Sequence, residues 1–110
     1  MSTPQNPVVE QHSATIKVRS IFSLNGQIVR ESDDSSEIEL PRMDPAAPIC
    51  TVSIDKSVTK NLGNYNSFKV SAFCSTPCYL DDGQIAAAQT FASTQVDNCI
   101  KMVMTEEGLN

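Results

Sequence analysis

Tryptophan is absent from this chain of 110 residues, and aromatic residues make up only 5% of it. A core without large aromatic side chains has to be built mainly from Val, Ile and Ala with a few Phe, so it will be thin for one domain. Packing against a second copy of the chain would bury the apolar surface that such a core leaves exposed. The composition therefore favours a single small domain that forms a homo-oligomer.

Residue patterns that support catalysis are also scarce. The 4 glycines are isolated from one another, so the chain has no glycine-rich loop that could hold a phosphate. The single histidine, His12, lies near the amino terminus, and a Cys–His pair would require that segment to fold back. The pairs Asp33–Asp34 and Asp81–Asp82 could hold Mg²⁺, but a solvated loop and a helix start explain them more simply. We therefore expect a protein that is not an enzyme, with no catalytic residue, no cofactor and no metal site.

Long apolar segments are missing as well. The chain contains no run of about 18 apolar residues, the length that a membrane-spanning helix needs. Residues 1–7 lack a positively charged region followed by an apolar stretch, so they do not match a secretory signal. These absences predict a cytoplasmic protein with no membrane partner.

Four cysteines are present, and in a reducing cytoplasm they are expected to be thiols. The first interpretation is that they are buried and pack as small apolar groups. Two alternatives stay open, a zinc site made of the thiolates and a disulfide within the Cys74–Cys78 loop. Structural zinc usually takes ligands in closely spaced pairs, which this spacing does not supply. The cysteines are Cys50, Cys74, Cys78 and Cys99.

Basic residues are outnumbered, with 8 Lys and Arg against 13 Asp and Glu and a net charge of −5. This balance disfavours broad electrostatic capture of duplex DNA or of an anionic membrane, because both require clustered Lys and Arg. A local basic strip on an acidic protein remains possible, and binding through such a strip would be sensitive to salt.

The amino-terminal half is predicted to form a β-hairpin. Residues 1–13 are polar and contain two prolines, which is typical of a flexible tail. Residues 14–24 alternate between apolar and polar types, as a half-buried strand does. Asn25–Gly26 suits the positive φ angles of a type I′ turn, and residues 27–30 form the returning strand. Residues 31–36 are expected to be an acidic loop, 37–40 a short edge strand, and 41–48 a proline-rich linker.

The carboxy-terminal half, 49–106, reads as a ββα unit. Strands are predicted at 51–60 and 67–74, with a turn at 61–66 and a corner at Pro77–Cys78. Asp81 and Gln84 resemble a capping box at the start of a long helix, whose apolar residues recur at three- and four-residue spacing. The predicted fold class is α+β, with an antiparallel sheet of four or five strands packed by one long carboxy-terminal helix, as a single domain over 14–110.

Two binding functions are compatible with the surface residues, and single-stranded nucleic-acid binding is the preferred one, with protein binding as the alternative. A basic sheet face with exposed aromatic residues can follow a single-stranded nucleic acid and stack its bases. The simpler explanation of the same lysines is ordinary solvated strand residues. The candidate nucleic-acid-binding residues are Lys17, Arg19, Lys56, Lys60, Lys69, Tyr65 and Phe73.

A compact acidic loop can instead imitate a nucleic-acid backbone and occupy the basic groove of another protein. The chain would then be a protein-binding inhibitor or adaptor. The simpler explanation of the same acidic residues is a loop that aids solubility. The candidate partner-binding residues are Glu31, Asp33, Asp34, Glu37 and Glu39.

The string Asn-Leu-Gly-Asn-Tyr at 61–65, between two strands and followed by Pro77–Cys78 and an amphipathic helix, resembles a group of small bacteriophage and prophage proteins. The resemblance covers about residues 52–106 and excludes the amino-terminal hairpin, the acidic loop and the proline linker. It implies a phage-type accessory protein that acts on DNA or on host enzymes in the host cell cytoplasm. It supplies no catalytic residue to carry over.

Overall fold

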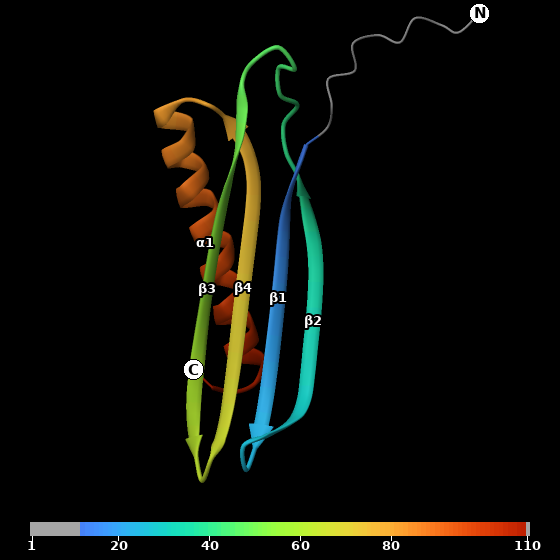
Figure 1. Cartoon of the computed structure of the whole chain (residues 1–110), viewed down its shortest axis with the longest axis vertical. Coiled ribbons are helices and arrows are strands. Elements are labelled where there is room, and N and C mark those ends of the chain that lie inside the picture. Colours follow the sequence, from blue (N-terminus) through green and yellow to red (C-terminus); the bar gives the residue numbers. More distant parts are fainter. Residues whose placement is uncertain (1–11, 110) are drawn as a thin grey trace, which may run out of the picture.

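The computed structural model describes residues 12–109 and contains four strands and one helix. The elements follow the chain in the order β1 (Ser13–Leu24), β2 (Gln27–Glu39), β3 (Ile49–Gly63), β4 (Asn66–Tyr79) and α1 (Asp82–Glu106). The strands form one antiparallel sheet in the order β2-β1-β4-β3, and α1 lies on one face of it (Figure 1). The predicted α+β fold class is confirmed.

Both hairpins end in turns with left-handed backbone. Asn25 and Gly26 have φ angles of 53° and 77°, which confirms the type I′ turn expected from their sequence. The second hairpin turns at Asn64 and Tyr65, with φ angles of 53° and 63°. The two turns are also tied together, because the Gly26 N–H donates to the Tyr65 carbonyl oxygen at 3.0 Å. The hairpin tips therefore form one end of the molecule.

β2 corrects the prediction for residues 31–36, which are not a loop. They continue the strand, and the ladder with β1 runs from Leu24 opposite Gln27 to Ser13 opposite Glu39. Ser13 accordingly belongs to β1 and not to the expected tail, while residues 1–11 of that tail lie outside the described residues. Serine and aspartate have low strand propensity, but an edge strand needs only backbone pairing and can leave its side chains in water. Nearly every side chain of β2 is exposed.

β3 and β4 are longer than predicted, and Pro77–Cys78 is not a corner. β4 continues to Tyr79, with Pro77 paired opposite Thr51 of β3. On the other side of β4, the ladder with β1 ends at Ser75. Pro77 therefore lies where β4 has a paired neighbour on one side only, so its missing N–H does not interrupt a central ladder.

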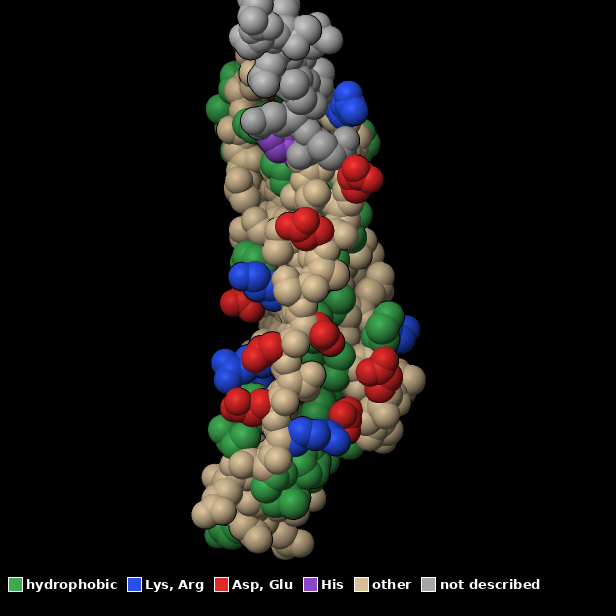
Figure 2. Space-filling model, turned by 90° about the vertical axis from the view of Figure 1, so that its right-hand side faces the viewer, with side chains coloured by type: hydrophobic (Ala, Val, Ile, Leu, Met, Phe, Trp, Pro, Cys, Tyr) green, Lys and Arg blue, Asp and Glu red, His purple; other side chains and the backbone are tan. Residues whose placement is uncertain are grey.

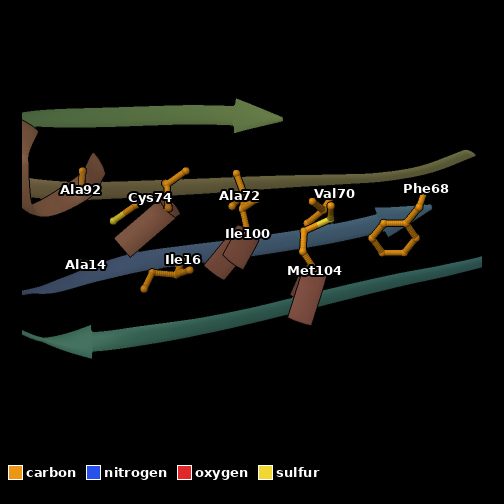
Figure 3. Close-up of a cluster of buried hydrophobic side chains, with 10 residues drawn as sticks. Ala14, Ile16, Phe68, Val70, Ala72, Cys74, Ala92, Ile100 and Met104 are labelled. Atoms are coloured by element: carbon orange, nitrogen blue, oxygen red, sulfur yellow. The ribbon is translucent and has the colours of Figure 1, made fainter. Parts of the chain in front are cut away.

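The core lies between α1 and the even-numbered residues of β1 and β4. Figure 3 shows buried side chains of β1 and β4 in one cluster with side chains of α1. The largest fully buried side chains are those of Phe68, Val70, Val96 and Cys74. The buried cluster consists of Ala14, Ile16, Phe68, Val70, Ala72, Cys74, Ala92, Val96, Ile100 and Met104.

α1 begins and ends with hydrogen-bonded caps. The Gln84 N–H donates to the Asp81 carboxylate at 3.0 Å, which confirms Asp81 as the N-cap. At the other end Gly108 has a φ of 69° and its N–H donates to the Thr105 carbonyl oxygen at 3.0 Å. Between these caps the helix packs mainly on β4 and β3, and β2 lies beyond its edge (Figure 1).

Candidate binding surfaces

The sheet presents two different faces. Even-numbered residues of β1, β3 and β4 face α1, and odd-numbered residues face the opposite side, here called the open face. No element of the described chain covers the open face (Figure 1). An uncovered face of a four-stranded sheet is a natural place for a partner to bind. Whether a candidate residue lies on that face follows from whether its number is odd or even.

The predicted basic face is divided between the two sides of the sheet. Lys17, Arg19, Lys69 and Phe73 lie on the open face, with Lys17 directly opposite Phe73 across the β1–β4 ladder. The other three predicted residues lie elsewhere, which corrects the prediction of one basic face. Lys56 and Lys60 lie on the side that carries α1, and Tyr65 lies at the hairpin tip with 87% of its surface exposed.

The ammonium group of Lys56 already has hydrogen-bond partners within the fold. Its Nζ donates to the Ser93 Oγ and to the Asp97 carboxylate, each at 2.9 Å, and both acceptors belong to α1. The ammonium group therefore ties the edge strand β3 to the helix. This contact explains why the apolar side of β3 carries a lysine in the middle of the strand.

Arg19 is also paired internally. Its Nη2 lies 3.4 Å from the Glu31 carboxylate and its Nε lies 3.8 Å from the Asp33 carboxylate, both on β2. The open face as a whole is acidic, since Lys17, Arg19 and Lys69 are outnumbered by the carboxylates on its strands. Those carboxylates are Glu31, Asp33, Glu37, Glu39 and Asp55.

The predicted acidic set, in contrast, stays together. Glu31, Asp33, Glu37 and Glu39 lie on the open face at odd-numbered positions of β2, with Ser35 between the two pairs, and together they form the acidic stripe. Asp34 points to the other side. Alternate residues of a strand are about 6.8 Å apart, so the acidic stripe extends over about 27 Å. Figure 2, viewed onto the β2 edge, shows acidic side chains along this side of the molecule.

A hollow of about 380 Å³ lies on the open face beside the acidic stripe. Lys17, Arg19 and Asp33 line one side of it, and Asp55 and Phe73 line the other. Ammonium, guanidinium, carboxylate and aromatic groups are thus brought together around one space. Such a lining can hold a charged side chain or a polar group of a partner.

Two of the four cysteines form a pair across the sheet that the spacing in the sequence does not indicate. Cys50 and Cys78 lie opposite each other on β3 and β4, and their Sγ atoms are 3.4 Å apart. Cys74 and Cys78 are on one strand, about 13 Å apart, so the Cys74–Cys78 disulfide considered above is excluded by geometry. All four cysteines are free thiols, and within residues 12–109 no group of three or more His, Cys, Asp or Glu is placed to hold a metal ion.

An irregularity near the hairpin turn decides which residues face Cys78. The pair Gly63–Asn66 is followed by Asn61–Ser67, so the register shifts by one residue at Leu62. Without this shift, Cys50 would lie opposite Tyr79. Only knowledge of this bulge could have revealed the thiol pair from the sequence.

Burial governs the ionisation of the thiols. It raises the pKa of Cys78, and a hydrogen bond with Cys50 raises it further. It also raises the pKa of Cys74, with a smaller contribution from the neighbouring Cys99, and the pKa of Cys99 itself. The raised pKa values keep the thiols of Cys74, Cys78 and Cys99 protonated near neutral pH.

Comparison of the chain with protein-family models, with curated proteins and with solved structures found no match. Among the described residues, no helix is both long and apolar enough to cross a membrane.

Proposed function

We propose that this chain is a non-enzymatic accessory binding protein whose acidic stripe contacts a basic surface on a partner protein. The observation that carries the proposal is the placement of four carboxylates at odd-numbered positions on one face of an exposed edge strand. The phage-type resemblance of residues 52–106 agrees with an accessory role acting on a host protein.

Charge and spacing support this choice over the nucleic-acid alternative. The acidic stripe has negative charges about 6.8 Å apart within the pairs Glu31–Asp33 and Glu37–Glu39, and about 13.6 Å apart across the neutral Ser35. A basic groove can accept such a line of negative charges. Glu37 and Glu39 have no ion pair with a described residue closer than 4.0 Å, so they are available to a partner, whereas Glu31 and Asp33 share Arg19. Contacts between exposed charges weaken with salt, and binding should do the same.

A defined peptide tests the proposal. The probe is a short fluorescein-labelled peptide of alternating Lys and Ser, which as a strand presents a positive charge at every second residue. We expect its fluorescence anisotropy to rise on titration with the protein at low salt. Glu37→Gln with Glu39→Gln should weaken binding several-fold, since each exposed ion pair contributes about 0.2–1 kcal/mol.

A matched pair of neutralised residues separates the stripe from overall charge. Asp82→Asn with Asp97→Asn removes the same charge from exposed positions on α1, and Asp97 pairs with Lys56 at the edge of the sheet opposite β2. This variant should bind the peptide like the unmodified protein. Equal losses in the two double variants would mean that net charge alone attracts the peptide, and the proposed role of the stripe would be wrong.

Single-stranded nucleic acid is the second candidate, and one observation favours it. Phe73 lies half-buried on the open face with Lys17 opposite it, and Lys69 is nearer the hairpin tip on the same face. An aromatic group flanked by ammonium groups can stack a base and contact its phosphates. The segment between Lys56 and Leu80 contains no acidic residue, so this part of the open face is its least acidic.

Anisotropy of a labelled single-stranded oligonucleotide tests this second candidate. Binding should weaken with salt and be lost in Lys17→Gln with Lys69→Gln, but not in the control Arg42→Gln with Lys101→Gln. The control residues are exposed and lie outside the open face of the sheet. An oligonucleotide that does not bind at low salt would remove this candidate.

A further inference from the structure

The thiols of Cys50 and Cys78 form a pre-arranged pair between an edge strand and a central strand. They are directly opposite residues of the β3–β4 ladder and both point to the side that carries α1. Opposite residues in an antiparallel sheet have Cα atoms about 4.5–5.5 Å apart, and disulfides span about 4.4–6.8 Å. With Sγ atoms 3.4 Å apart, a bond could form without moving either strand.

We propose that Cys50 and Cys78 are a reversible disulfide site that reacts with small-molecule disulfides such as oxidised glutathione. The Cys50 thiolate attacks one sulfur of the oxidant and releases a glutathione thiolate. Cys78 then loses its proton and attacks the Cys50 sulfur of the mixed disulfide, which releases the second glutathione. Two protein thiols are oxidised, one glutathione disulfide is reduced to two thiols, and the two protons go to the released glutathiones.

The different environments of the two cysteines assign this order. Cys50 is partly exposed on the edge strand, while Cys78 is only 7% exposed. A molecule as large as glutathione can reach Cys50 and cannot readily reach Cys78. Cys78 is therefore the resolving thiol, and Cys50 is the thiol that meets the oxidant.

The disulfide would add a covalent link to the start of β3, which the β4 ladder and the hydrogen bond from the Leu80 N–H to the Pro48 carbonyl oxygen already hold. β3 is an edge strand, and Ile49 follows directly on the irregular segment that connects β2 to β3. Met43 of that segment is buried, and it lines a hollow of about 320 Å³ together with Cys78 and Phe91. Oxidation would thus join this end of the molecule covalently to β4, and it should raise Tm by several degrees.

Mass spectrometry of the full chain tests the site. The reduced protein is incubated with oxidised glutathione, unfolded in denaturant, alkylated so that buried thiols also react, and digested without reduction. We expect an intact chain lighter by two hydrogen atoms, a Cys50–Cys78 linked peptide, and alkylation at Cys74 and Cys99 only. Dithiothreitol should reverse the change and lower Tm to its starting value.

Single variants test the assigned order. Cys78→Ser should accumulate the glutathione adduct on Cys50, whereas Cys50→Ser, a change at a partly exposed position, should leave Cys78 without an adduct. Cys74→Ala with Cys99→Ala should still form the disulfide. The proposal would be overturned by four alkylated cysteines in the unmodified protein after incubation, or by a Cys74–Cys99 link in place of the expected one. Both results are measured on the unmodified chain, so they do not depend on whether a variant folds.

Discussion

At the scale of single residues, Tyr65 has both an exposed side chain and an unfavourable backbone conformation. Its φ angle of 63° lies in the left-handed region, which costs a residue with a Cβ roughly 1–2 kcal/mol. The two-residue turn of Asn64 and Tyr65 has left-handed backbone at both positions, and the hydrogen bond from the Gly26 N–H to the Tyr65 carbonyl oxygen holds it in place. The aromatic ring is therefore displayed at the tip at some cost in stability.

Two substitutions at Tyr65 measure that cost. Both Tyr65→Gly and Tyr65→Ala remove the ring, but only glycine relieves the left-handed backbone. We expect the glycine variant to have a free energy of unfolding about 1 kcal/mol higher than the alanine variant, measured by urea denaturation. Equal stabilities would mean that the turn is not left-handed at this position.

Cys74 makes stability depend on alkaline pH. Burial, and to a smaller extent the neighbouring Cys99, raise the pKa of its thiol above the ordinary value of 9.0. A group whose pKa is higher in the folded state adds stability that is complete below the unfolded pKa and is lost as the pH rises through the folded pKa. The free energy of unfolding should therefore fall above about pH 9.

Urea denaturation between neutral pH and about pH 10 measures this dependence. Lys and Tyr side chains titrate in the same range, so the comparison is with Cys74→Ala. The variant should be less stable at neutral pH because it leaves a small cavity, but its stability should decline less steeply at alkaline pH. Parallel curves would show that Cys74 is not the group responsible.

At the scale of secondary-structure elements, features that depend on neighbouring residues could be predicted from the sequence. Features that depend on pairing with a distant segment could not. The Asn25–Gly26 turn and the Asp81 N-cap depend on neighbouring residues, and both were predicted correctly. The serines and aspartates of residues 31–36 are typical of a loop, so the local composition predicts a loop there. Pairing with β1 makes these residues a strand. Pairing with a distant segment cannot be read from local composition.

The candidate site was predictable to a similar extent. The alternation in the sequence correctly placed Lys17 and Arg19 on one face and predicted that the acidic residues lie near each other. It wrongly assigned Lys56 to the same face as Lys17 and Arg19. The position of the helix over β3 decides that Lys56 contacts Asp97, and no local pattern reports this. The register shift at Leu62 likewise determines the Cys50–Cys78 pair.

Proline substitutions test whether 31–36 is a strand. On an edge strand the N–H groups of successive residues point alternately toward the neighbouring strand and toward water. One of Ser35→Pro and Ser36→Pro should therefore lose a hydrogen bond to β1 that the other keeps, and their free energies of unfolding should differ by about 1 kcal/mol or more. Thermal or urea unfolding measures the difference, and a loop would tolerate both prolines to a similar extent.

At the scale of the whole molecule, charge and apolar surface are unevenly distributed. The acidic stripe follows the β2 edge, while the hairpin tips carry exposed apolar side chains and no carboxylate. The expected homo-oligomer stays a prediction, and these tips are the apolar surface that a second copy could cover. The exposed large hydrophobic residues at this end are Leu24, Ile28, Val29 and Tyr65.

The measurement that tests the central claim most directly is an NMR titration of the labelled protein with the alternating Lys-Ser peptide at low salt. The account predicts that backbone amide shifts concentrate on residues 31–39 of β2 and on the facing part of β1, and that they disappear as salt is added. Shifts spread evenly over the surface, or confined to α1 or to the β3–β4 hairpin, would contradict the claim that the acidic stripe is the binding surface.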